Sequence, residues 1–347
     1  MIGILLFFIS FLVSYFGVAI FIRLSSKHGL VDIPNDRSSH ETPTPRGGGL
    51  VIVVISLFAY YIICTYLNHN ISWGYIFGVS IIALVSCVDD IYSVPVIFRF
   101  LIHSIAAYLA VADLTYWNEI NIAITGSTFH LGSLGFVVTF LWVVWMINAF
   151  NFMDGIDGIA GLQAIITSSG WLVFSLIFGY WTIYLFSGVL LFAVFGFLIH
   201  NWSPAKIFMG DVGSSFLGFT FAVIPLIALK EKPESSLITL VIAIAFVWLF
   251  LFDTIVTFGI RLFSGKKFWN AHREHIYQKL VISGLSHSVI TILYGVIAVL
   301  ISIAGLAFAF FGGIFGYILI CMIIVTTSAL LIVNSRKNAL TLRVKKC

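Results

Sequence analysis

Residues 2–22 read IGILLFFISFLVSYFGVAIFI, a run without a single charged side chain. A transmembrane helix needs about 20 consecutive, mostly apolar residues, and this run meets that length. It has no basic segment in front of it and is longer than the apolar part of a typical signal peptide. The run therefore predicts a first transmembrane helix and not a cleaved leader.

Apolar runs of this kind recur along the whole chain. Of its 347 residues, 61% are hydrophobic and 9% are charged, whereas a soluble domain carries about 25% charged residues. This composition excludes a water-soluble protein and predicts an all-α, polytopic membrane bundle of about eleven helices, with one membrane domain over 1–333 and a basic cytoplasmic tail over 334–347. The predicted spans are 2–22, 48–67, 73–88, 99–112, 133–149, 160–178, 181–199, 212–229, 236–260, 289–311 and 313–333.

The basic residues support this count and give an orientation. If the N-terminus faces outside, the cytoplasmic segments hold sixteen of the eighteen Lys and Arg residues, and only Lys230 and Lys232 lie outside. Cytoplasmic loops of membrane proteins carry this excess of positive charge. The bias predicts a cytoplasmic C-terminus. Nearly all dense polar clusters lie in the same segments, which predicts a site at the cytoplasmic surface.

The cysteines and the net charge indicate no further partner. Cys64, Cys87, Cys321 and Cys347 lie far apart and form no Cys-x-x-Cys pair, so neither a disulfide framework nor a zinc site is expected from them. The net charge of +4 is too small to indicate a nucleic acid partner. Apolar helix faces can meet either lipid or a second subunit, which leaves a homodimer open.

The densest polar cluster is the segment 148–158, which reads NAFNFMDGIDG. Asn148, Asn151, Asp154 and Asp157 recur every three residues, and on a straight helix each such step drifts by about 60°. The four side chains can therefore meet only if the glycines let the helix break. Oxygen donors of this kind suit Mg²⁺. The alternative is helix capping by Asn and Asp, which accounts for one such residue but not for four.

Other acids lie at the ends of predicted spans. Asp89 and Asp90 end the third span, where carboxylates are costly unless they bind a cation or transfer a proton. The alternative is a solvated helix end, although the helix dipole disfavours acids there. Asp211 follows Gly210 at the start of another span and either ligates a metal or caps the helix. Arg99 is a candidate phosphate-binding residue.

The first cytoplasmic loop carries a basic, glycine-rich segment. Residues 43–49 read PTPRGGG, and backbone N–H groups of such glycines can cradle an anion. Arg37 and Arg46 could bind phosphate. The alternative is a stiff, proline-rich connector.

A histidine pair marks the last large cytoplasmic loop. Residues 271–279 read AHREHIYQK, which places His272 and His275 on one helical face. One interpretation of the pair is a zinc site, but no thiol or third imidazole joins it. Contact with an anion or a nucleotide is therefore favoured. In that reading Tyr277 could stack on a base.

Asp253 lies within an apolar run, about two helical turns before Arg261. An acid inside a membrane span is a functional candidate. Pairing with a neighbouring helix is the alternative, and the sequence leaves both open.

Five of these segments, in this order, resemble the motifs of the polyprenyl-phosphate N-acetylhexosamine-1-phosphate transferase superfamily (glycosyltransferase family 4). They span about residues 30–280, and residues 37–40 with 271–275 look closest to the branch that initiates O-antigen synthesis. The matching segments are 32–49, Asp89-Asp90, 148–158, 209–214 and 272–275.

The resemblance implies an enzyme of the bacterial inner membrane. A polyprenyl phosphate oxygen would attack the β-phosphate of a UDP-N-acetylhexosamine, UMP would leave, and the first lipid-linked intermediate of lipopolysaccharide synthesis would remain. Mg²⁺ would be the cofactor, with Mn²⁺ as an alternative. The donor sugar is left open between GlcNAc, FucNAc, QuiNAc and other N-acetylhexosamines.

The resemblance also implies roles for single residues. Asp89 would deprotonate or orient the lipid phosphate. The fifth motif departs from that of family members in which it contains only histidines, because Arg273 and Glu274 interrupt it here. The implied catalytic residues are Asp89, Asp90, Asp154 and Asp157, the implied metal ligands are Asp211 and Asn151, and the implied substrate-binding residues are Arg46, Arg99, Asn148, His272, Arg273 and His275.

Two other classes compete with this reading. A CDP-alcohol phosphotransferase also has an Asp-Gly signature, but residues 154–158 lack the Ala-Arg pair that would follow it. A proton-coupled transporter should place ionisable groups near the middle of the membrane, and only Asp253 indicates this.

Overall fold

The structure is a computed structural model that describes residues 2–28, 31–34, 42–122, 127–265 and 273–344. Helices dominate it, and two short antiparallel hairpins lie in loops. The helices are α1 (Ile2–His28), α2 (Gly49–Leu67), α3 (Trp73–Tyr92), α4 (Val96–Asp113), α5 (Ser133–Met153), α6 (Ile159–Phe178), α7 (Trp181–Asn201), α8 (Gly210–Glu231), α9 (Ser236–Phe246), α10 (Trp248–Phe263), α11 (Ile276–Ile282), α12 (His287–Phe311) and α13 (Ile314–Val344). The hairpins pair β1 (Val31–Asp32) with β2 (Thr44–Pro45) and β3 (Glu119–Ile122) with β4 (Ser127–His130).

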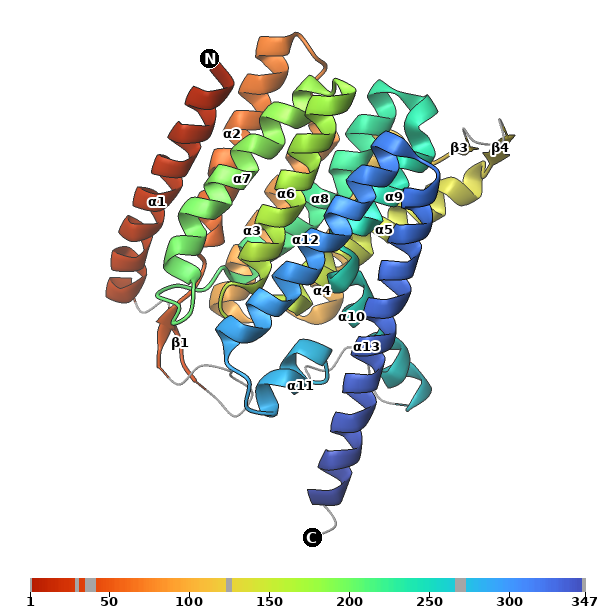
Figure 1. Ribbon diagram of the computed structural model, residues 1–347. Coiled ribbons are helices and arrows are strands. Elements are labelled where there is room, and N and C mark those ends of the chain that lie inside the picture. Colours follow the sequence, from red (N-terminus) through yellow and green to blue (C-terminus); the bar gives the residue numbers. More distant parts are fainter. Residues whose placement is uncertain (1, 29–30, 35–41, 123–126, 266–272, 345–347) are drawn as a thin grey trace.

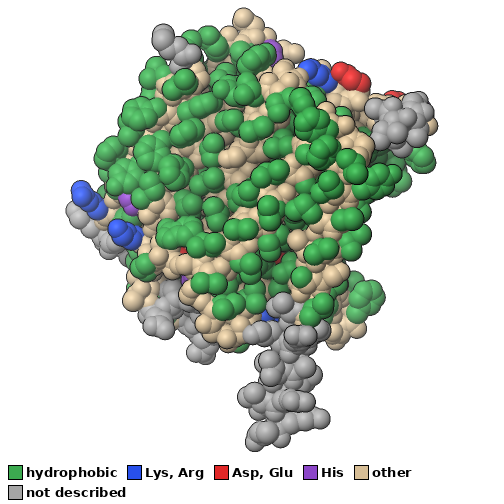
Figure 2. Space-filling view, in the orientation of Figure 1, with side chains coloured by type: hydrophobic (Ala, Val, Ile, Leu, Met, Phe, Trp, Pro, Cys, Tyr) green, Lys and Arg blue, Asp and Glu red, His purple; other side chains and the backbone are tan. Residues whose placement is uncertain are grey.

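The helices confirm the predicted membrane bundle. Within the described residues, ten helices are long and apolar enough to cross a membrane, and the bent pair α9–α10 makes eleven if it counts as one span. The two termini lie at opposite ends of the bundle, as an odd number of spans requires (Figure 1). Hydrophobic side chains cover most of the visible face, and charged side chains are few (Figure 2). Which end faces the cytoplasm stays a prediction.

Helix α8 forms the centre of the bundle, and its apolar stretch is entirely buried. Helices in a bilayer associate through close packing because lipid is as apolar as their side chains. The closest approach joins α8 to the start of α2, where a Cβ added at Gly49 would lie 2.3 Å from the Cα atom of Gly213. The N–H group of Gly49 also donates to the carbonyl of Met209 over 2.9 Å. These contacts fix residues 46–49 beside the segment that precedes α8.

The run 236–260 was predicted as one span, and the structure breaks it. Helices α9 and α10 meet at Val247 with a bend of 74°. Asp253, Thr257 and Arg261 recur every four residues along α10, and all three are buried. The bend turns this polar face toward α11 and leaves apolar side chains of α10 exposed. Average hydropathy does not reveal such a break because it ignores which face carries the polar groups.

The packing of α2 on α8 can be tested with one methyl group. Gly49→Ala should lower the free energy of unfolding by about 1–3 kcal/mol, because its Cβ has no room against the α8 backbone. Gly259→Ala in α10 is the matched control, since no atom of the described residues, apart from the adjoining backbone of α10 itself, lies within 4 Å of the added Cβ. Thermal unfolding in detergent measures both variants. Equal midpoints for the two variants would contradict the close packing.

Candidate active site

A cavity of about 420 Å³ opens among the ends of α3, α4, α5, α8, α10 and α11. Its wall contains both polar and apolar side chains. The polar side chains are Ser86, Arg99, His103, Asn148, Asn151, Asp211, Ser215, Thr254, Thr257, Arg261, His275 and Gln278. The apolar ones are Val96, Phe100, Val144, Trp145, Ala149, Phe152 and Phe258.

The adjacent acids at the end of α3 have different partners. Asp89 accepts hydrogen bonds from the N–H group of Val94 over 2.5 Å and from Nη1 of Arg99 over 2.7 Å. Asp90 accepts from the guanidinium of Arg46 and, over 3.2 Å, from the N–H group of Asp211. These partners offset the unfavourable position of two carboxylates at a helix C-terminus.

Arg99 joins two of these acids. The same Nη1 atom lies 2.7 Å from Asp89 and 3.0 Å from Asp211. The sequence predicts that Arg99 binds phosphate, and in the structure its guanidinium contacts two carboxylates. Arg99 and Asp211 both line the cavity, so a phosphate that entered it would meet the guanidinium directly.

The cluster at 148–157 does not converge as a whole. Asn148 and Asn151 belong to the last turns of α5 and line the cavity, where Nδ2 of Asn151 donates to the hydroxyl of Ser214 over 3.2 Å. Helix α5 ends at Met153. Asp157 lies away from the cavity wall, where it accepts from the N–H group of Ala205 over 3.2 Å. The predicted break in the helix therefore separates Asp157 from the asparagines.

Asp157 instead joins loops to helix α12. Its Oδ2 atom lies 3.4 Å from Nδ1 of His287, and its carbonyl accepts from Thr291 over 2.9 Å. Burial acts to raise the pKa of Asp157, but the hydrogen bond and charge of His287, with the Ala205 N–H, hold this pKa below its ordinary value. This acid stabilises the fold around the site.

Asp154 lies close to the acids of the site. Burial raises the pKa of Asp154 to about 8, and the negative charges of Asp211 and Asp90 add to the rise. A carboxyl with this pKa is mostly protonated at neutral pH. A cation among these acids would reverse the effect by favouring the charged form.

The donor atoms here fit Mg²⁺ better than a metal held by protein alone. Among the residues that the structure describes, no three His, Cys, Asp or Glu side chains are grouped to hold an ion. Mg²⁺ commonly takes one or two protein oxygens and completes its shell with water and substrate phosphates. Asp211 and Asn151 face the same cavity and offer such oxygens, and Oδ2 of Asp90 is buried without a partner among the described residues.

The fifth motif reaches the cavity through His275. This residue is 4% exposed, lines the cavity and precedes α11 as its N-cap. Burial raises the pKa of the Tyr277 phenol, and the positive charge of the nearby Arg273 acts to lower it. His272 lies outside the described residues, as do Arg37 and residues 38–40 of the first loop.

Tyr277 is buried, which contradicts the suggested stacking on a base. Its side chain has no exposed surface, and its hydroxyl donates to the carbonyl of Phe152 over 2.9 Å. A Cβ added at Gly155 would lie 2.1 Å from that hydroxyl oxygen, so only glycine fits there. Tyr277 thus packs α11 against the turn after α5.

Sequence reasoning missed His103 as a cavity residue. It lies one helical turn after Arg99 in α4, lines the cavity and is 6% exposed, with Nδ1 buried and unpartnered among the described residues. Its spacing of four residues from Arg99 is a usable signal, because such pairs share a helix face. An apolar run around it concealed that signal.

Comparisons with known proteins agree with these motifs. Residues 72–229 match glycosyl transferase family 4. The chain is 28% identical over 302 residues to a probable undecaprenyl-phosphate N-acetylglucosaminyl 1-phosphate transferase of Bacillus subtilis (strain 168), covering 86% of this chain and 84% of that protein. It is 30% identical over 289 residues to the undecaprenyl-phosphate alpha-N-acetylglucosaminyl 1-phosphate transferase of Pasteurella multocida (strain Pm70), covering 80% of each. A decaprenyl-phosphate N-acetylglucosaminephosphotransferase of Mycobacterium tuberculosis (strain ATCC 25618 / H37Rv) is 26% identical over 314 residues, covering 82% of this chain and 77% of that protein.

The raised pKa of Asp154 makes a prediction about stability. The folded state holds this proton up to about pH 8, whereas an unfolded chain releases it near pH 4. Stability from this group is therefore lost as pH rises through that window. Asp154→Asn should raise the thermal midpoint over wild type by more at pH 8 than at pH 5, in metal-free buffer.

Asp157→Asn is the control of opposite sign. Its low pKa means that the charged carboxylate stabilises the fold above about pH 4, so this variant should melt below wild type at both pH values. A gain for Asp154→Asn that is the same at pH 5 and pH 8 would contradict the proton held at Asp154.

Proposed function

Since the chain belongs to the family of polyprenyl-phosphate N-acetylhexosamine-1-phosphate transferases, we propose that it transfers N-acetylhexosamine 1-phosphate from a UDP-sugar to undecaprenyl phosphate. The lipid phosphate oxygen forms a bond to the β-phosphorus, the bond from that phosphorus to the bridging oxygen breaks, and UMP leaves with that oxygen. The observation that carries the proposal is a cavity whose wall contains both ionic and apolar side chains.

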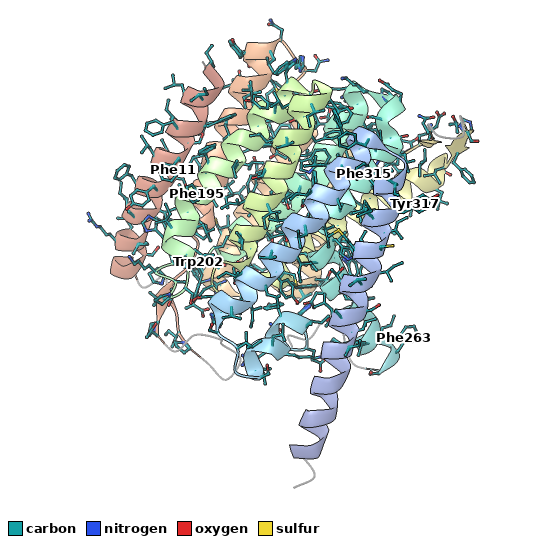
Figure 3. The ribbon with its side chains drawn as sticks, in the orientation of Figure 1. Phe11, Phe195, Trp202, Phe263, Phe315 and Tyr317 are labelled. Atoms are coloured by element: carbon teal, nitrogen blue, oxygen red, sulfur yellow. The ribbon has the colours of Figure 1, made fainter. Side chains whose placement is uncertain are left out.

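The apolar part of the cavity suits the lipid substrate. Phe100, Trp145 and Phe258 line it, and a polyprenyl chain gains from contact with such side chains because it is itself a hydrocarbon. Helix α10 continues this surface outward and ends at Phe263, which is 92% exposed and projects from the lower end of the bundle (Figure 3). The lipid phosphate would enter along this surface.

The ionic part suits two phosphate-bearing substrates. Arg99 would exchange both of its carboxylate partners, Asp89 and Asp211, for two oxygens of a phosphate, which offers the planar guanidinium an equivalent pair of acceptors. Asp89, released from that contact, would then orient the lipid phosphate or accept its proton. Arg46 would keep Asp90 in place through their ion pair.

Mg²⁺, when bound, neutralises the diphosphate and polarises the phosphorus that is attacked. Asp211 and Asn151 would hold it, and Asp154 would lose its proton beside it. Asn148, Arg273 and His275, with His272, would bind the nucleotide sugar on the side of α11. The names of the relatives above contain N-acetylglucosaminyl as the transferred group. UDP-GlcNAc is therefore the first donor to test, followed by donors with FucNAc and QuiNAc.

The positive-inside bias supports an active site at the cytoplasmic face of the inner membrane. There a soluble nucleotide sugar can meet a lipid phosphate. The product would be the first lipid-linked intermediate of a cell-surface polysaccharide, with O-antigen as the proposed pathway.

Release of UMP tests this function. Purified protein with UDP-GlcNAc, undecaprenyl phosphate and Mg²⁺ should release UMP, and chelation should stop it. Asp211→Asn should lower kcat by roughly 100-fold or more, because it removes an anionic metal ligand from a preorganised charged site. Glu119→Gln in the distant hairpin β3 is the control and should retain wild-type turnover. No UMP from the wild type with any UDP-N-acetylhexosamine would overturn the proposal.

A further inference from the structure

Asp253 has no exposed surface and yet makes five hydrogen bonds within the protein. Its Oδ1 atom accepts from Nδ1 of His275 over 3.0 Å, from the N–H group of Ile276 over 2.9 Å and from the hydroxyl of Thr257 over 3.3 Å. Its Oδ2 atom accepts from the N–H group of Tyr277 over 3.2 Å and from the hydroxyl of Tyr294 over 3.0 Å. This count answers the question that the sequence left open: Asp253 pairs with neighbouring elements.

These bonds converge on one short segment. Three of the five donors belong to residues 275–277, where the chain enters α11. A buried charge is retained only where hydrogen bonds replace its hydration. Asp253 meets that condition by fixing the turn that places His275 in the cavity wall.

We propose that Asp253 is a positioning residue that orients His275 toward the donor diphosphate. The inference rests on the proposed transferase function. A carboxylate that accepts from Nδ1 keeps the proton on that nitrogen and fixes the plane of the ring. His275 lines the cavity, so the carboxylate fixes the orientation of an imidazole that, when protonated on both nitrogens, can donate from Nε2 to a phosphate oxygen.

The same carboxylate connects His275 to the end of α5. It holds the backbone of Tyr277, whose hydroxyl donates to the carbonyl of Phe152 over 2.9 Å. Phe152 follows Asn151 and also lines the cavity. Asp253 therefore fixes the distance between residues 275–277, which would bind the donor, and Asn151, the proposed metal ligand.

A double-mutant cycle tests whether Asp253 acts through His275. Asp253→Asn and His275→Gln should each raise the KM for UDP-GlcNAc by about tenfold, the lower end of what removal of a supporting hydrogen bond costs a site. The double variant should show no more than the larger single effect, because the two residues form one unit. The KM for undecaprenyl phosphate should change less than about twofold.

Tyr294→Phe is the matched control. It removes one hydrogen bond from the other oxygen of the same carboxylate and leaves the His275 contact. It should lower the thermal midpoint and leave the donor KM unchanged. A donor KM that rises in Tyr294→Phe as in Asp253→Asn, or effects that multiply in the double variant, would overturn the proposal.

A spectroscopic measurement covers the case in which Asp253→Asn does not fold. The ¹⁵N chemical shifts of His275 in the wild-type protein, assigned by comparison with His275→Gln, should show a protonated Nδ1. A bare Nδ1 would overturn the inference whether or not the enzyme turns over. Absence of UMP release from the wild type would instead count against the proposed function alone.

Discussion

The site depends on an ionic network in which each of the three acids at the C-terminal end of α3 and the N-terminal end of α8 meets an arginine. Arg46 pairs with Asp90, while Arg99 joins Asp89 to Asp211. Charges at the edge of a bilayer are costly unless they are paired and hydrogen-bonded. The pairs therefore hold the ends of α2, α3, α4 and α8 together.

Most of the fold follows from the sequence because the bilayer allows only helices of a certain length. The apolar runs at 73–88 and 181–199 lie within α3 and α7, and both helices extend them by a few residues. The break between α9 and α10 was missed. The bend turns the face of α10 that carries Asp253 toward its hydrogen-bond partners, and these partners belong to residues distant in sequence.

The sequence predicted the site residues that lie on helices lining the cavity. It did not predict the positions of residues in the turns that follow those helices. Asn148, Asn151 and Asp211 line the cavity as their oxygen atoms suggested. Asp157 shares their spacing but belongs to the turn after α5, where it bonds the Ala205 N–H. Tyr277 was read as a residue for a base, yet it packs inside the protein, because composition alone does not reveal which side of a short helix is buried.

A cryo-EM structure in nanodiscs with Mg²⁺ and UDP-GlcNAc would show where the donor diphosphate binds. We expect density for the diphosphate inside the cavity, between Asp211 and His275, with the Arg99 guanidinium moved from Asp211 onto a phosphate oxygen. Diphosphate density outside the cavity, with the contact between Arg99 and Asp211 still at about the 3.0 Å seen here, would contradict this expectation.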